Sequence, residues 1–98
     1  MTLLSGRDAS PKVQAQIALT LAKLAKQEKA LKDLHNIRVR QTEVGLFVHY
    51  HCRFSPLMNV ESVHAAVDRL ETRFMQLQPK VRRVVAHAEP LGRAKHEL

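Results

Sequence analysis

The chain has 98 residues, a formal net charge of +7 and a single cysteine, Cys52, which leaves room for one modest domain but excludes an internal disulfide and a four-cysteine zinc site. A domain of this size buries only about 60% of its unfolded surface, so we expect its stability to depend on a partner chain or a ligand. No apolar run approaches the ~18 residues that span a bilayer, and the first residues do not resemble a signal peptide, which predicts a cytoplasmic protein without direct membrane insertion.

The first part of the chain predicts a flexible N-terminus followed by a long helix. Residues 1–10 lack periodicity, and Ser10 followed by Pro11 is a typical helix start. An apolar stripe at spacings of three, four and seven, interrupted only by Glu28, extends this helix to about residue 33. The stripe consists of Val13, Ile17, Leu21, Leu24, Leu31 and Leu34. The opposite face carries Lys23, Lys26, Lys29 and Lys32.

A β-hairpin is predicted next, because the apolar period changes to two at Ile37. Gly45 offers a turn, and the alternation resumes from Leu46 to Phe54. One face of this second strand holds the expected core residues Leu46, Val48, Tyr50, Cys52 and Phe54. The opposite face holds Phe47, His49, His51 and Arg53.

The last part of the chain predicts a second helix and a third strand. Asn59 is a suitable N-cap for a helix with strict three-four apolar spacing that ends near Pro79. Alternation over about 82–89 predicts the strand, and residues 92–98 form a flexible polar tail. The predicted fold is therefore one α+β domain over residues 11–91, in the order αββαβ. Two helices cover one face of a three-stranded sheet and leave the other face free.

Histidine is the residue type that suggests chemistry. His49 and His51 lie two apart on one predicted strand, and His87 and Glu89 lie two apart on another, so each pair projects from a single face. If both pairs share the uncovered face, four ligand-type groups converge, and imidazole with carboxylate is a typical set for zinc and related ions. His35 and His64 lie at element ends. His96, in the tail, is interpreted as a surface residue.

Other function classes are less well supported. Cys52 lies on an apolar strand face, only three glycines are present, and no paired carboxylates occur, so we expect no enzyme. The net charge of +7 and the lysine-rich first helix leave a nucleic-acid-associated module as an alternative. A third possibility is a dimerisation domain that works without metal.

The segment Leu34-His35-Asn36-Ile37-Arg38-Val39-Arg40 resembles the His-Asp-Leu-Arg-x-Arg signature of the cytoplasmic C-terminal domain of cation diffusion facilitators. Residues 47–51 resemble the second strand of that domain, which ends in a ligand histidine. Residues 60–65 resemble its Ala-His helix start, and residues 84–90 its closing His-x-Asp-Pro strand. The resemblance covers about residues 34–91. Asn36 replaces the aspartate of the signature.

The resemblance implies a fold similar to copper metallochaperones, an open ferredoxin-like arrangement. It also implies a homodimeric regulatory module for zinc or another divalent transition metal, with no transport activity of its own. A full-length cation transporter is a further implied partner. The implied metal ligands are His35, His51, His64 and His87, with Glu89 in the place of the family's aspartate. His49 is an additional contact only.

Overall fold

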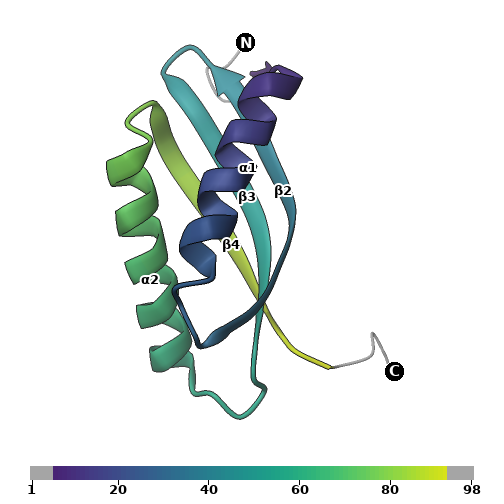
Figure 1. The fold of residues 1–98 in the computed structure, drawn as a ribbon, viewed down its shortest axis with the longest axis vertical. Helices are drawn as coiled ribbons and strands as arrows, with labels where there is room; N and C mark the ends of the chain where they lie inside the picture. The colour runs from purple at the N-terminus through teal and green to yellow at the C-terminus, as the bar shows by residue number, and fades with distance from the viewer. Residues whose placement is uncertain (1–5, 93–98) are drawn as a thin grey trace.

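The computed structural model describes residues 6–92, and two helices lie over one face of a four-stranded sheet (Figure 1). The elements are β1 (Arg7–Asp8), α1 (Pro11–Ala25), β2 (Leu31–Thr42), β3 (Gly45–Phe54), α2 (Val60–Leu77) and β4 (Val81–Pro90). The strand order is β1-β2-β3-β4. Neither helix in the described residues is long and apolar enough to cross a membrane.

The sheet is mixed because its connections differ in length. β1 and β2 pair antiparallel, as do β2 and β3, which form a tight hairpin. Gly45 in its turn has a φ of +137°, and a Cβ there would lie 2.7 Å from the Lys80 carbonyl oxygen, so a larger residue does not fit. β4 pairs parallel with β3, because α2 carries the chain back across the sheet between them.

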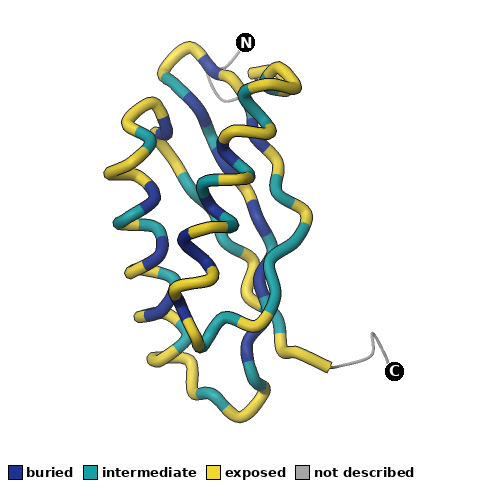
Figure 2. Tube along the Cα trace, viewed as in Figure 1, coloured by how far each residue is buried: buried dark blue, intermediate teal, exposed yellow. Residues whose placement is uncertain are grey.

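The core lies between the helical layer and the sheet. All five predicted core residues of β3 are buried, which confirms the face assigned from the alternation. They pack with Ile17 and Leu21 of α1 and with Leu70 and Phe74 of α2. Figure 2 shows these buried stretches along both helices and the central strand. The opposite, open face of the sheet is covered by no element of the described chain (Figure 1).

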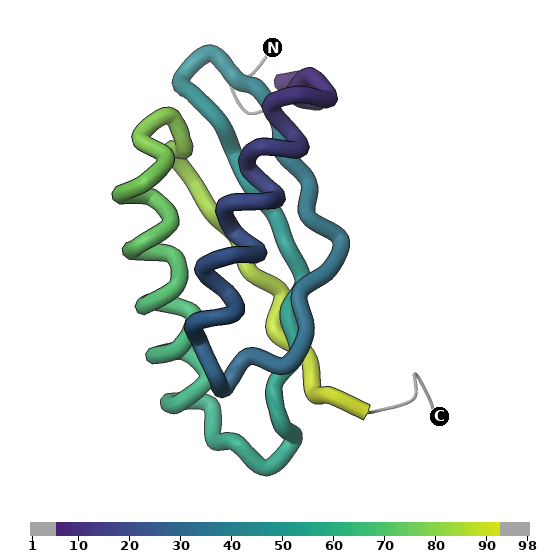
Figure 3. Tube along the Cα trace, in the orientation of Figure 1, coloured from purple at the N-terminus to yellow at the C-terminus, as the bar shows by residue number. Residues whose placement is uncertain are grey.

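α1 is shorter than predicted, since it ends at Ala25 rather than near residue 33. The chain then reverses into β2 through a tight turn (Figure 3). Glu28 in this turn is only 8% exposed, and its carboxylate accepts two hydrogen bonds from Arg69 of α2, at 3.0 and 2.9 Å. This contact between residues distant in sequence favours the reversal. The helical spacing of Leu31 and Leu34 is therefore coincidental, because both lie in β2.

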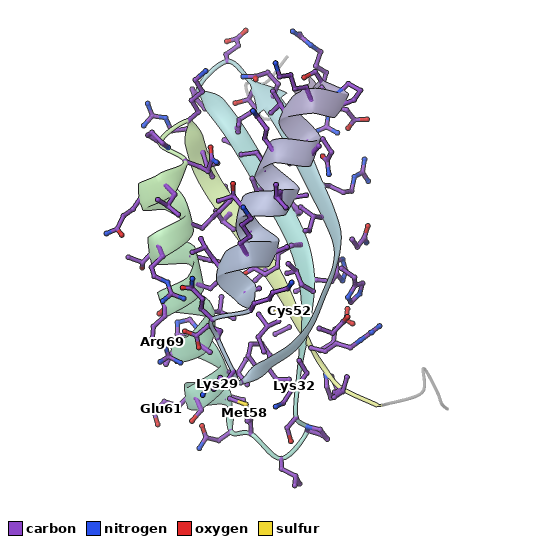
Figure 4. The ribbon with its side chains drawn as sticks, in the orientation of Figure 1. Lys29, Lys32, Cys52, Met58, Glu61 and Arg69 are labelled. Carbon is purple, nitrogen blue, oxygen red and sulfur yellow. The ribbon has the colours of Figure 1, made fainter. Side chains whose placement is uncertain are left out.

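The prediction of a lysine-rich face on the first helix is also wrong. Lys29 lies in the turn and Lys32 in β2, and Figure 4 shows both near the end of the molecule where Arg69 approaches the turn. Only Lys23 of the four lysines lies within α1. The alternative of a nucleic-acid module that uses a lysine-rich first helix loses the surface on which it depended.

The sheet has a fourth strand, where three were predicted. β1 falls within the predicted flexible N-terminus, but its two residues pair with Gln41 and Arg40 of β2. Two residues carry no recognisable period, so this strand could not be seen in the sequence. β2 also begins at Leu31 instead of Ile37, because the predicted helix was extended into it.

A β-bulge interrupts β2 between His35 and Arg38. Asn36 within it has a φ of 53°, a left-handed conformation that asparagine tolerates better than most residues. The Gln14 side chain of α1 donates to the Ile37 carbonyl oxygen at 2.8 Å and accepts from the Val39 amide at 3.0 Å. The bulge therefore has its backbone groups satisfied by the helix above it.

Candidate metal centre

Four rows of side chains cross the open face of the sheet, one residue from each of β2, β3 and β4. Counted from the C-terminal end of β3, the pairing register aligns Asp33, Arg53 and Glu89; His35, His51 and His87; Arg38, His49 and Val85; and Arg40, Phe47 and Arg83. Acidic residues therefore lie at one end of the face, three histidines come next, and arginines gather at the other end. The bulge allows both His35 and Arg38 to remain on this face.

Three groups form a cluster that can hold a metal ion. One ligand atom from each of His35, His51 and Glu89 lies within 4.8 Å of the others, and we call these residues the three-ligand cluster. His51 Nδ1 is 2.9 Å from Glu89 Oε2, and His35 Nε2 is 3.9 Å from Glu89 Oε1. Two ligands of one tetrahedral zinc ion are about 3.3 Å apart, so these separations suit a shared ion.

Asp33 and Arg53 support the cluster from the acidic end. Asp33 Oδ2 is 2.7 Å from His35 Nδ1 and accepts a hydrogen bond from Arg53 at 3.1 Å. The Arg53 guanidinium also lies 3.6 Å from Glu89. A carboxylate that holds one ring nitrogen of a histidine leaves the other nitrogen free for a metal. Asp33 therefore directs Nε2 of His35 toward Glu89.

His87 and His49 extend the histidine group without belonging to the three-ligand cluster. The ring of His87 stacks on that of His51 with a centroid separation of 4.7 Å. His49 lies in the next row of the face, with its ring centroid 6.0 Å from that of His87. Both strand pairs therefore lie on the uncovered face, but of their four groups only His51 and Glu89 belong to the three-ligand cluster.

His64, the remaining predicted ligand, lies on α2 in the helical layer. Its side chain is 76% exposed, and its Nε2 is 3.4 Å from the Asp68 carboxylate, one helical turn away. Within one chain, the described residues do not bring His64 to the three-ligand cluster. His96 lies outside the described residues.

The electrostatics of the open face change along the strands. The hydrogen bond from His51 lowers the pKa of Glu89, with further lowering by the charges of His51, His35 and Arg53, so this carboxylate is held ionised. At the other end, desolvation followed by the charges of His87 and three arginines lowers the pKa of His49. A carboxylate that stays charged suits a cation at the cluster. The positive charges at the arginine end of the face disfavour a cation there.

Cys52 is not a candidate ligand or nucleophile. Its side chain is fully buried in the core between the sheet and the helices, and desolvation raises the pKa of its thiol to about 11. A thiol that stays protonated in an apolar core is chemically inert. This agrees with the prediction that Cys52 is a small core residue.

The comparison with known families places this site in context. Residues 13–91 match the family described as "Cation efflux protein, cytoplasmic domain". The chain belongs to this family. Family membership confirms the resemblance found at the histidine-containing segments, and it extends that resemblance over α1. No curated protein matches the sequence as a relative.

Solved structures with the same fold include cytoplasmic domains of cation efflux proteins. The metal-bound C-terminal domain of the CzcD transporter from Thermotoga maritima is similar with a TM-score of 0.78 and 16% identity, over 85% of this chain and 96% of that chain. The zinc form of the putative zinc transporter CzrB is similar with a TM-score of 0.77 and 22% identity, over 92% of this chain and 98% of that chain. The cytosolic domain of a cation diffusion facilitator family protein is similar with a TM-score of 0.76 and 16% identity, over 83% of this chain and 96% of that chain. These likenesses confirm the α+β fold.

Asp33 is the site residue that the sequence interpretation missed. It was assigned to the end of the first helix, where it carried no relation to His35. The available signal was its spacing, because an acid two residues before a histidine shares its strand face. Arg53 was placed on the correct face, but its contact with two carboxylates depends on the pairing of three strands.

Proposed function

We propose that this cation efflux cytoplasmic domain binds a divalent transition-metal ion, such as zinc, through His35, His51 and Glu89. The observation that carries the proposal is the meeting of three ligand atoms within 4.8 Å on an uncovered sheet face. Two imidazoles and a carboxylate are a donor set that suits zinc and its neighbours. His87 is the nearest further imidazole and is proposed as an additional ligand.

The domain is further proposed to act as a cytoplasmic homodimer that responds to metal, with neither transport nor catalysis of its own. Phe47 and Val85 are only half-buried on the open face, and a second copy would cover them. Within one chain His64 stays apart, so its predicted ligand role requires a site shared between two copies. A full-length cation transporter is the alternative partner for the same face.

Zinc should stabilise the folded protein if the proposal is correct. A ligand present at about a hundred times its Kd adds about 2.7 kcal/mol to the stability of the native state, which moves the Tm of so small a domain by several degrees. The effect should fade on acidification from about pH 7 to pH 5.5, because imidazole coordinates only when neutral.

The experiment compares thermal melts of His51→Ala and His49→Ala with and without zinc. Both substitutions remove an imidazole from the same strand and face, but only His51 belongs to the three-ligand cluster. We expect the zinc-induced shift to disappear in the first variant and persist in the second. Native mass spectrometry with and without chelator then reports metal and chain stoichiometry. An unchanged melt of the unaltered protein in excess zinc would contradict the proposal.

A further inference from the structure

A second site on the open face lies next to the three-ligand cluster and shares His51 and His87 with the proposed metal centre. Beside the three-ligand cluster lies a hollow of about 290 Å³, on the arginine side of the histidine row. We call it the basic hollow. It is lined by Asn36, Arg38, Arg40, His49, His51 and His87. We propose that the basic hollow binds a phosphate group, either as inorganic phosphate or pyrophosphate, or as part of a small phosphorylated molecule.

The lining chemistry favours an anion over a second metal. His49 and His87 lie close enough to suggest another cation site, with ring centroids 6.0 Å apart. No carboxylate of the described chain lines the hollow, however, whereas Arg38 and Arg40 do. Repulsion by these fixed positive charges disfavours a metal ion there and attracts an oxyanion.

Arg83 does not line the hollow, but its charge adds to the positive potential around His49. It lies on the open face of β4, in the same row as Arg40 and one row beyond His49. Its charge acts on His49, and it forms no ion pair with a carboxylate among residues 6–92. Arginine is well suited to phosphate, because its planar fork donates two parallel hydrogen bonds to phosphate oxygens.

Asp8 forms long, exposed ion pairs with Arg38 and Arg40. Its Oδ1 lies 3.7 Å from Arg38 and 3.6 Å from Arg40, and its side chain is 74% exposed. Pairs at such distances on a solvated surface interact weakly. A guanidinium has five N–H donors, so the contact with Asp8 does not exhaust those of Arg38. Arg40 also donates to the Gly6 carbonyl oxygen at 2.9 Å. The net charge of the side chains around the hollow therefore remains positive.

The bulge in β2 gives the hollow its shape. Asn36 adopts its left-handed conformation where the bulge interrupts the regular pairing, and it lines the hollow with Arg38 just beyond. The Gln14 hydrogen bonds to the bulge backbone hold this part of β2 in place. The hollow is therefore built into the sheet. Liquid water occupies about 30 Å³ per molecule, so the volume is sufficient for a phosphate group and several waters.

The test uses the full chain, stripped of metal with a chelator that is then removed, so that failure of metal binding cannot affect the result. Inorganic pyrophosphate and adenosine diphosphate are titrated separately by calorimetry at low ionic strength, where surface charges are least screened. Comparable binding of both supports recognition of the phosphate groups alone. Binding of the nucleotide only, with loss in the variant below, supports a phosphorylated metabolite as the source.

The deciding variant combines Arg38→Gln with Arg83→Gln, both exposed residues whose replacement leaves the core intact. Its control combines Lys12→Gln with Lys23→Gln, which removes the same charge from the helical layer. We expect the arginine variant to bind about tenfold more weakly or worse, and the lysine variant to stay within about twofold. The imidazole resonances of His49 and His87 should shift on saturation of the unaltered protein. Absence of saturable binding, equal losses in both variants, or unmoved imidazole resonances would overturn the proposal.

Discussion

Replacement of Asp33 by asparagine is expected to weaken zinc binding while leaving the fold intact. Asp33 Oδ2 lies 2.7 Å from His35 Nδ1, which leaves Nε2 of that ring to face Glu89. Asparagine has nearly the same shape, but it lacks the charge that makes this hydrogen bond strong and that favours a nearby cation. Its amide can also rotate and present a donor to the ring, which would stabilise the wrong tautomer.

The expected magnitude differs between metal affinity and stability. Loss of a carboxylate that orients a ligand histidine typically reduces metal affinity about 10- to 100-fold, or about 1.4–2.7 kcal/mol. The ion pair between Asp33 and Arg53 has side chains that are 34% and 40% exposed, so solvent screens it. Its loss should change the free energy of unfolding by less than about 1 kcal/mol.

Zinc affinity is measured by competition with a coloured chelator, and stability by urea unfolding of the metal-free protein. Nitrogen-15 NMR of the His35 ring reports which nitrogen carries the proton. We expect Nδ1–H in the unaltered protein and a shift toward Nε2–H in Asp33→Asn. Asp8→Asn is the matched control, because it removes an acid that pairs with Arg38 and Arg40 and not with the histidine cluster.

The reasoning is refuted if Asp33→Asn binds zinc as tightly as the Asp8→Asn control and the His35 tautomer is unchanged. A parallel loss of stability and affinity would point to a purely structural role for Asp33. Intact stability with weakened zinc binding and an altered tautomer is the combination that only the positioning role produces.

Two further predictions concern the fold around the site. Gln14→Ala should lower the free energy of unfolding by about 1–2 kcal/mol, because two backbone groups of the bulge lose their hydrogen-bond partners. The same substitution should weaken zinc binding. Urea unfolding checks this, with Gln16→Ala as the exposed control. Glu71, which accepts a hydrogen bond from Tyr50 at 3.0 Å, has a pKa raised above 4.5, first by desolvation. The folded state therefore holds the Glu71 proton more tightly than the unfolded state. The free energy of unfolding declines as the pH rises from the pKa of Glu71 in the unfolded state to its pKa in the folded state. Glu71→Gln should gain stability relative to the unaltered protein between about pH 4 and pH 7, as measured by melts across that range; a constant difference would contradict this.

The elements with a complete local period were predictable from the sequence. β3 alternates strictly from Leu46 to Phe54, and α2 keeps three-four spacing to Leu77, so each has one face that only burial can satisfy. The same alternation placed His51 opposite the core face of its strand, and it put His87 and Glu89 together on one face of theirs. Resemblance at the histidine segments then identified the family and the fold.

The residues that complete the site depended on contacts between distant parts of the chain. The reversal after α1 is favoured by the ion pair between Glu28 and Arg69, which no local pattern reveals. Without that reversal, residues 31–34 were read as helix, and the relation of Asp33 to His35 was lost.

The sequence by itself determined which side chains face the core and which face outward, because that choice follows from the period of each element. Tertiary structure decided which outward side chains meet. His35 lies opposite His51 because the strands pair in this register, and it shares the open face with Arg38 because the bulge at Asn36 takes up the extra residue. Such a bulge is stabilised by Gln14 from another layer, a physical cause that lies outside any local stretch of sequence.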